Sequence, residues 1–356
     1  MKVGERGKKE KEKEVQWDLI DRCLLPLIFS HAAAVIITTF LNTLNISQIS
    51  FFSVFFILVF FTLLITLSFH NLKVSYAGKC IVLSGCENHI GYSIAKYLDD
   101  LGFTVYAGFN GNEKQKQKLK NECSGRLNTL DLDISSEESI TVVLKNVQQL
   151  QTGVWAVVNA ASWSAFGESE WVPTSVLKKT IDVNLLGAIA LSRSFLPVLR
   201  KTKGRIINIT SIAGRIRSGI RSPLCIVSSG LQSFSDCLRL NMKRWGVDVV
   251  LIETGMTTTG AWYERNDMLN EARKLWHSLN GDQREVYNEK YFECKITSMN
   301  EYSNDQEDLS MLLKAVGDAV TRTFPLARYT PVTRKEKLQA FVAEHLPHSV
   351  YSIMYE

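Results

Sequence analysis

The stretch that decides the fold is residues 80–98, CIVLSGCENHIGYSIAKYL. Its first five residues form a short apolar run with β-branched side chains, which predicts a buried strand. The stretch from His89 onward predicts a helix. A turn of small residues, beginning with Ser84 and Gly85, joins the two elements. Backbone N–H groups at the start of a helix favour a phosphate group. The turn is therefore a candidate phosphate-binding loop.

The glycine spacing in this turn is incomplete. A turn of the pattern GxxxGxG needs glycine at positions 85, 89 and 91, and His89 stands at the middle position. A side chain there hinders the close approach of the backbone to a phosphate group. A protonated imidazole, in contrast, pairs with phosphate. Both interpretations stay open at this point.

Five more strands are predicted after the first, and helical stretches separate them. Strands that alternate with amphipathic helices imply right-handed crossovers and a parallel sheet covered on both faces. The predicted fold class is α/β, a doubly wound parallel sheet of the Rossmann kind, with residues 73–356 forming one domain. The five strands are TVYAGF (104–109), RLNTLDL (126–132), WAVVNA (155–160), RIINIT (205–210) and VDVVLIE (247–253).

A charged tail (1–23) and two apolar segments precede this domain. Residues 24–41 are apolar apart from two threonines, Ser30 and His31, and residues 49–69 contain no charged side chain. The second segment is long enough to cross the hydrocarbon core of a bilayer. Because the connection between the segments is short and uncharged, residues 24–72 are predicted to form a transmembrane hairpin. The alternative is a single span with the domain in the lumen.

Charge supports a cytosolic domain and argues against nucleic acid as a partner. Basic residues from Lys2 to Lys13 precede the hairpin, and Lys73 and Lys79 follow it, which places both flanks in the cytosol by the positive-inside tendency. The endoplasmic reticulum is the predicted location. A net charge of +5 from 41 basic and 36 acidic residues is too mild for a nucleic-acid binder. The odd number of cysteines, without paired spacing, predicts neither disulfides nor a metal site.

Several motifs occur in the order typical of the short-chain dehydrogenase/reductase family, which the chain resembles over roughly residues 79–330. The resemblance is greatest to the branch of the D-3-hydroxybutyrate, retinol and 17β-hydroxysteroid dehydrogenases. It implies that Asp133 holds an adenine ring, that Asn184 is the catalytic asparagine and that Ser211 orients the substrate. The motifs are LDLDIS around Asp133, VNAAS with Asn159 and Ala160, IDVNLLG around Asn184 and NITSIAG around Ser211.

The resemblance also implies a cofactor, NAD or NADP, because the family transfers hydride between nicotinamide and a carbonyl group. NAD is favoured, although Asn110 and Asn112 stand after the second strand, where an acid would fix the choice. The lysines from Lys114 to Lys120 are a solvated helix face or a clamp for a 2′-phosphate. The residues assigned to the nucleotide are Ser84, Gly85, Glu87, His89, Ile90, Gly91, Asp133, Asn159, Ala160, and Thr254 and Gly255 in place of the family's Pro-Gly.

The family's proton donor and its assisting cation are missing from their expected positions. In the family pattern a tyrosine follows the serine by 13 residues and a lysine follows the tyrosine by four, and these positions hold Leu224 and Ser228. The phenol exchanges the proton, and the lysine lowers the pKa of that phenol. Tyr291 and Lys295 have the right spacing, but they lie in the variable substrate-covering segment and are interpreted as a decoy.

Other side chains have two interpretations each. Weak surrogate proton donors are Cys225, Ser228, His89 and Tyr263. The arginines form a solvent-facing rim or mark an anionic ligand; they are Arg205, Arg215, Arg217 and Arg221. Large apolar residues line a hydrophobic pocket or pack in the core; they are Met256, Trp262, Tyr263, Met268 and Trp276.

Two functions follow. The first is a membrane-anchored, NAD(P)-dependent oxidoreductase of lipid metabolism, acting on a sterol, steroid or retinoid, with its chemistry impaired by Leu224 and Ser228. The alternative is a catalytically inactive pseudoenzyme that binds a lipid or cofactor as a scaffold. The expected partners are a hydrophobic small molecule, the membrane and a second copy of the chain, joined through the helices that carry Asn184 and Leu224.

Overall fold

The computed structural model describes residues 17–46, 49–149, 153–163, 165–256, 258, 265–300 and 308–355. The chain divides into two compact units. The first comprises Met1–Val74 with Arg322–Phe324, and the second comprises Ser75–Thr321 with Pro325–Glu356.

The first unit contains two apolar helices, α1 (Trp17–Thr43) and α2 (Phe51–Asn71). By length and composition, Cys23–Thr43 and Phe51–Asn71 could cross a membrane, and the predicted segments 24–41 and 49–69 correspond to them. The helices pack through small residues at four-residue spacing, because Ser30, Ala34 and Thr38 are buried. Ser30 Oγ lies 3.0 Å from Thr62 Oγ1 on α2. Small side chains of this kind let membrane helices approach closely.

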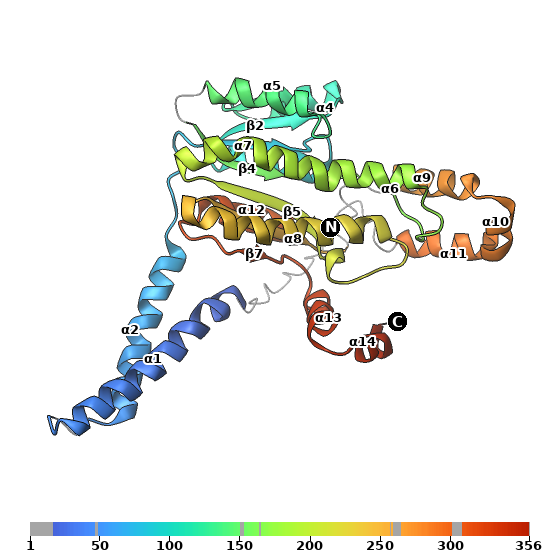
Figure 1. The fold of residues 1–356 in the computed structure, drawn as a ribbon. Helices are drawn as coiled ribbons and strands as arrows, with labels where there is room; N and C mark the ends of the chain where they lie inside the picture. Colours follow the sequence, from blue (N-terminus) through green and yellow to red (C-terminus); the bar gives the residue numbers. More distant parts are fainter. Residues whose placement is uncertain are drawn as a thin grey trace, which may run out of the picture. The chain divides into compact units, whose positions relative to one another are not determined.

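Within the described residues, seven strands form one parallel sheet in the order β3-β2-β1-β4-β5-β6-β7 (Figure 1). The predicted doubly wound parallel sheet is confirmed. The order reverses between β1 and β4, and ligands bind outside the carboxyl ends of strands at such a point. The strands are β1 (Cys80–Ser84), β2 (Thr104–Phe109), β3 (Leu127–Asp131), β4 (Val154–Asn159), β5 (Arg205–Ser211), β6 (Asp248–Thr254) and β7 (Arg328–Tyr329).

Helices cover both faces of the sheet because alternate side chains of the central strands point to opposite faces. Ile81 and Leu83 of β1 belong to one hydrophobic core, and Cys80 and Val82 belong to the other. The first core is completed by α3 (His89–Asp100), α4 (Glu113–Glu122) and α12 (Ser310–Thr321), and the second by α5 (Glu137–Gln148), α7 (Ala188–Thr202) and α8 (Ser222–Met242).

The remaining helices connect these elements or follow the sheet. Thr174–Thr202 is also apolar enough to cross a membrane by length and composition, but its α7 part covers the sheet. The remaining helices are α6 (Thr174–Ile181), the π-helical turn η1 (Asp182–Gly187), the short η2 (Ile212–Gly214) and η3 (Lys243–Trp245), α9 (Arg265–Ser278), α10 (Gly281–Tyr287), α11 (Glu289–Asn300), α13 (Arg334–His345) and α14 (His348–Tyr355).

Candidate functional site

The turn after β1 is packed so closely that two of its positions accept only glycine. Gly85 has a φ of +79°, and a Cβ atom there would lie 2.4 Å from the backbone of Ala161. A Cβ atom on Gly91 would lie 2.0 Å from the carbonyl oxygen of Gly85. The first turn of α3 is therefore held directly against the loop that follows β4.

Asn88 holds this turn together, although it was not predicted as a site residue from the sequence. Its Oδ1 accepts a hydrogen bond of 2.7 Å from the N–H of Gly91, and its Nδ2 donates one of 3.1 Å to the carbonyl of Ala160. Ser84 Oγ accepts the N–H of Ala160 at 3.3 Å. An asparagine just before a helix is a common N-cap, so a signal was present in the sequence. The N–H groups of His89 and Ile90 lie in the first helical turn, where no intrahelical acceptor is available.

The His89 side chain is exposed and does not pack inside the turn. It lines a surface hollow of about 470 Å³ together with Tyr92 and Ser93 of α3 and Lys118 of α4. The close packing of the turn is therefore compatible with a side chain at position 89.

Acidic side chains gather at the carboxyl ends of β2 and β3. Glu87 Oε2 accepts a hydrogen bond of 3.3 Å from the N–H of Asn110, and burial raises the pKa of this carboxyl group. Asp133 Oδ1 accepts the N–H of Ser135 at 2.9 Å and its hydroxyl at 2.6 Å. Lys116 binds Asp131 at 2.6 Å, so this lysine is committed to a neighbouring carboxylate.

A buried polar network fixes α7, which directly follows the η1 turn of Asn184, and α8, which carries Leu224 and Ser228. Asn159 Nδ2 donates to Ser192 Oγ on α7 at 2.9 Å and to Asn208 Oδ1 on β5 at 2.6 Å. Asn208 Nδ2 donates to Ser235 Oγ on α8 at 2.8 Å. Buried polar groups are costly without partners, so this network fixes both helices against the sheet. Three of its members, on α7, β5 and α8, were not predicted from the sequence.

Asn184 lies in η1, and π-helical turns are frequent at functional sites. Its Oδ1 accepts the N–H of Trp163 at 2.7 Å, and its Nδ2 donates to Ser162 Oγ at 3.3 Å. Asn184 thereby holds the loop after β4. Ser211, at the end of β5, is fully buried, and its Oγ accepts the N–H of Ala213 at 3.2 Å.

Leu224 and Ser228 lie one turn apart on α8, and both are buried. The Leu224 side chain belongs to an apolar cluster with residues of η2, the β6 loop and the C-terminal region. No phenol or ammonium group stands at these two positions. The buried members of the cluster are Ile212, Ala213, Ile216, Leu224, Val227, Met256, Val332 and Ala340.

The neighbouring thiol is a poor substitute for a phenol assisted by a lysine. Burial raises the pKa of Cys225, although Arg221 and Arg217 lower it in part. A thiol whose pKa is raised above its ordinary value gives up its proton less readily at neutral pH. Tyr263, another of the surrogate donors, follows β6 and lies outside the described residues.

The loop after β6 is held by α13, which the sequence did not indicate. Thr254 Oγ1 donates to the carbonyl of Thr210 at 3.0 Å. Glu336 Oε1 accepts the N–H of Met256 at 2.6 Å, and a Cβ atom on Gly255 would lie 3.0 Å from Glu336 Oε2. The small residue at position 255 thus leaves room for the Glu336 carboxylate.

The helices after β6 pack as a small aromatic core. Trp276 stacks on Phe292 with ring centres 4.6 Å apart, and Trp171 meets Trp276 edge-on at 5.9 Å. For Trp276 the core interpretation is therefore correct, and Met256 packs in the cluster of Leu224. Trp262, Tyr263 and the Met268 side chain lie outside the described residues.

Tyr291 and Lys295 both face Glu168 in the loop after β4. The Tyr291 hydroxyl donates to Glu168 Oε1 at 2.6 Å, and this bond raises the pKa of the phenol. Lys295 Nζ lies 3.6 Å from the same carboxylate. A phenol whose pKa is raised by a carboxylate is the opposite of the activated phenol that the chemistry requires, which agrees with the decoy interpretation.

We expect a Tyr291→Phe variant to match the unchanged protein within about twofold in its affinity for NADH, the reduced form of the cofactor that the family resemblance implies, because the phenol hydroxyl forms an exposed hydrogen bond with a carboxylate and the ring contacts remain. Calorimetric titration measures this affinity. Tyr287→Phe is the matched control, since Tyr287 donates an equivalent bond of 2.6 Å to Glu170. A tenfold loss of affinity or of any ketone turnover confined to Tyr291→Phe would contradict the decoy interpretation.

Three of the four arginines are structural. Arg205 is buried, stacks on Trp155 at 4.6 Å and lies 3.5 Å from Asp248. Arg221 is also buried and donates to the carbonyl of Met256 at 3.1 Å. The solvent-facing rim was therefore a wrong interpretation for both. Arg215 forms ion pairs with Glu253 at 3.1 Å and Glu344 at 2.6 Å.

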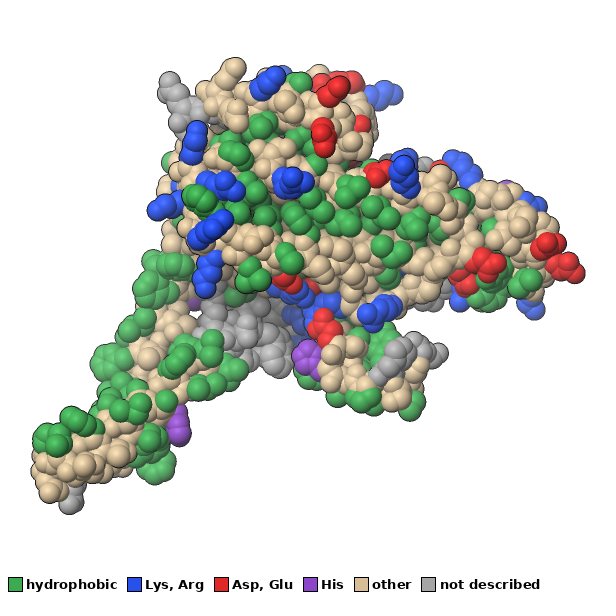
Figure 2. Space-filling view, viewed as in Figure 1, with side chains coloured by type: hydrophobic (Ala, Val, Ile, Leu, Met, Phe, Trp, Pro, Cys, Tyr) green, Lys and Arg blue, Asp and Glu red, His purple; other side chains and the backbone are tan. Residues whose placement is uncertain are grey.

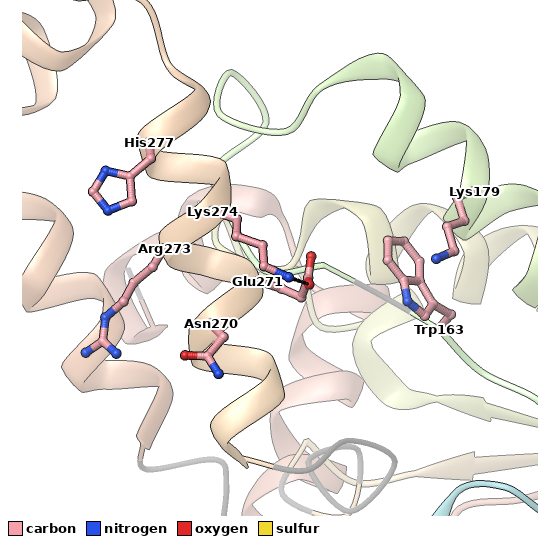
Figure 3. Close-up of a pocket in the computed structure, with 7 residues that line it drawn as sticks. All are labelled: Trp163, Lys179, Asn270, Glu271, Arg273, Lys274 and His277. Atoms are coloured by element: carbon pink, nitrogen blue, oxygen red, sulfur yellow. Dashed lines mark hydrogen bonds and ion pairs between the residues drawn. The ribbon is translucent and has the colours of Figure 1, made fainter. Parts of the chain in front are cut away.

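A surface cavity of about 530 Å³ lies between the loop after β4, α6 and α9 (Figure 3). Trp163, which Asn184 holds, lines one side, and Lys179 Nζ lies 4.2 Å from the centre of its indole ring. The other side is formed by polar and charged residues of α9, so the described lining of this cavity contains none of the large apolar residues considered as a pocket wall. These residues are Asn270, Glu271, Arg273, Lys274 and His277.

Comparison with known proteins gives a consistent picture. The family model described as "short chain dehydrogenase" matches residues 79–270. The chain is 34% identical over 288 residues to the mitochondrial D-beta-hydroxybutyrate dehydrogenase of Mus musculus, covering 78% of this chain and 84% of that protein. It is 33% identical to retinol dehydrogenase 16 of Mus musculus, and the match covers 71% of this chain and 80% of that protein. It is 30% identical to estradiol 17-beta-dehydrogenase 2 of Mus musculus, and the match covers 76% of this chain and 72% of that protein.

A solved structure shows the same fold. It is a short-chain dehydrogenase from Streptomyces avermitilis, with a TM-score of 0.61 and 19% sequence identity. The match covers 79% of this chain and 96% of that chain.

Proposed function

Because the chain belongs to the short-chain dehydrogenase family, we propose that it is a membrane-anchored protein of lipid metabolism that binds a nicotinamide nucleotide and a hydrophobic alcohol or ketone. A sterol, a steroid or a retinoid is the proposed ligand class. The observation that carries the proposal is the closed turn after β1, where Gly85 and Gly91 leave bare backbone and the Asn88 side chain holds the start of α3 in place. Such a cradle fits a pyrophosphate.

The residues around this turn have distinct roles in the proposed site. The N–H groups of His89 and Ile90 would hold the pyrophosphate, Asp133 the adenine, and Thr254 and Gly255 the nicotinamide end. Ser84, Glu87, Asn159 and Ala160 shape the walls. A bound nicotinamide nucleotide supplies or accepts a hydride. Ser211 and Asn184 would orient the substrate. Position 224, however, holds a leucine, which has no acidic group to exchange the proton. General acid–base catalysis contributes roughly 10² to 10⁴ in rate, so we propose that the family reaction is slow here.

The second candidate is a pseudoenzyme that binds a lipid or nucleotide without turnover. The observation that favours it is the packing of Leu224 inside an apolar cluster, which places no phenol at the position where the family has its proton donor. Calorimetry with NADH, followed by NADH oxidation with a panel of ketosteroids and retinoids, separates the candidates. Binding with measurable turnover supports the oxidoreductase, and binding without turnover supports the pseudoenzyme. No nucleotide binding at all would refute the proposed site.

NADH is expected to bind at least about tenfold more tightly than NADPH, a difference of about 1.4 kcal/mol. The reason is that the 2′-phosphate of NADPH would bring negative charge to the side of the site where Glu87 and Asp133 already stand. Calorimetric Kd values measure the preference. Glu87→Gln should reduce the ratio of the Kd for NADPH to the Kd for NADH. Lys114→Gln is the control, because it removes a lysine that would bind the 2′-phosphate if the lysines formed a clamp. Tighter binding of NADPH that is lost in Lys114→Gln would contradict this expectation.

The proposed location is the endoplasmic reticulum membrane with the domain in the cytosol, supported by the apolar helices α1 and α2 and by the basic residues that flank them. We also propose a homo-oligomer that forms through the helices carrying Asn184 and Leu224. Leu186 of η1 and Ile226 of α8 support it, because these large apolar side chains are 51% and 48% exposed.

A further inference from the structure

A basic surface surrounds Trp245 at the ends of α7 and α8. The guanidinium carbons of Arg200 and Arg244 lie 4.9 Å and 5.5 Å from the centre of its ring, and Trp245 remains 44% exposed. Basic side chains gather over these helix ends in Figure 2. We name this surface the basic edge and define it by Arg200, Lys201, Lys203, Lys243, Arg244 and Trp245.

The two chain segments of the basic edge lie side by side. A Cβ atom on Gly246 would lie 3.7 Å from the side chain of Lys203, and the N–H of Asp248 donates to the carbonyl of Gly204 at 3.1 Å. In the part of the chain that the structure describes, none of the five basic side chains forms an ion pair. The positive charge of the basic edge is therefore not neutralised by acidic neighbours within the described chain.

The topology places the basic edge at the amino ends of the strands. α7 ends at Thr202 before β5 begins at Arg205, and η3 ends at Trp245 before β6 begins at Asp248. All strands are parallel, so β1 also begins at this edge, and the nucleotide site lies at the opposite edge.

The connection from α2 to β1 is short compared with the width of the domain. α2 ends at Asn71 and β1 begins at Cys80, so residues 72–79 form the connection. Eight extended residues span at most about 28 Å. A compact domain of roughly 280 residues has a radius of gyration of about 19 Å and is thus nearly 50 Å across. The connection is therefore shorter than the domain is wide.

We propose that the basic edge docks on the anionic surface of the membrane that anchors the chain, with Trp245 in the interfacial layer. This inference rests on the membrane anchoring proposed above. Lysine and arginine are attracted to anionic headgroups, and tryptophan favours the boundary between headgroups and hydrocarbon. Arg200 and Arg244 flank the indole, so cation and ring reach the bilayer together.

The test uses the full chain in phosphatidylcholine vesicles with and without phosphatidylserine, each containing brominated lipid that quenches tryptophan. Subtracting the quenching of Trp245→Phe from that of the unchanged protein gives the part due to Trp245. We expect this part to be at least about twofold larger with phosphatidylserine, and to vanish in about 0.5 M salt, which screens surface charge.

Charge-reversal variants supply the control. Lys201→Glu with Lys243→Glu and Arg244→Glu should abolish the Trp245 part, whereas reversal of the three exposed lysines Lys114, Lys118 and Lys120 on α4 should preserve it. Equal loss in both triple variants, or no quenching of Trp245 with phosphatidylserine, would overturn the proposal. Protection of Trp245 from solvent in native membranes but not in lipid vesicles would also overturn the proposal, because it would indicate a protein partner. Retention after alkaline carbonate extraction tests the membrane anchor separately.

Discussion

Replacing Leu224 by tyrosine and Ser228 by lysine is expected to raise kcat/KM for NADH-dependent ketone reduction by about 10²- to 10⁴-fold. Both positions lie on α8, one turn apart, and the network of Asn159, Asn208 and Ser235 already fixes this helix against the sheet. A phenol at position 224 could supply the proton, and a lysine at 228 would favour the phenolate by its charge.

The measurement is steady-state oxidation of NADH with a ketosteroid panel, together with calorimetry to verify nucleotide binding. The matched control is Leu224→Phe with Ser228→Lys, which adds the ring and the ammonium group without the hydroxyl. It should stay at the rate of the unchanged protein. The double variant places larger side chains at two buried positions, so its melting temperature must be measured together with its activity. If a folded, nucleotide-binding double variant is no faster than the phenylalanine control, the proposed proton-transfer defect is wrong.

The sheet could be predicted because its signal is local. Each of the first six strands is a short apolar run between helical stretches, and the structure confirms them with bounds that differ by at most one residue at either end. The seventh strand, Arg328–Tyr329, was missed because two residues carry no period of their own. Its place is set by pairing with Leu251 and Ile252 of β6, which only the assembled sheet provides.

The site could be predicted only where its residues are neighbours in sequence. The small residues of the turn after β1 indicate its conformation, and Asn88 stands beside them as a detectable N-cap. Its second partner, Ala160, lies 72 residues away, and Glu336 lies 80 residues from Met256, which it holds. Nothing in one sequence specifies such pairs.

The arginines show the same limit in reverse. Arginine is usually a surface residue, so Arg205 and Arg221 were interpreted as part of a solvent-facing rim. In the structure Arg205 is buried against Trp155 and Arg221 against Met256, and both have a structural role. A charged side chain is buried when distant groups supply hydrogen bonds and ring faces. Those groups come from other elements of the fold, so local composition misassigned these arginines.

Gly91→Ala is expected to lower the free energy of unfolding by about 3 kcal/mol or more and to abolish NADH binding. Alanine is preferred over glycine inside a helix by about 1 kcal/mol, so propensity alone favours the substitution. The added Cβ atom would lie 2.0 Å from the carbonyl oxygen of Gly85, however, and that residue cannot retreat because it is itself packed on the Ala161 backbone. The clash is backbone against side chain, and it outweighs the propensity.

Urea unfolding of the full chain in detergent, followed by tryptophan fluorescence, measures the change, and calorimetry measures binding. Gly125→Ala is the matched control, since a Cβ atom there meets nothing within 4 Å. It should move stability by no more than about 0.5 kcal/mol. If Gly91→Ala and Gly125→Ala unfold at the same urea concentration, or if Gly91→Ala binds NADH normally, the closed turn is not the element that holds the nucleotide.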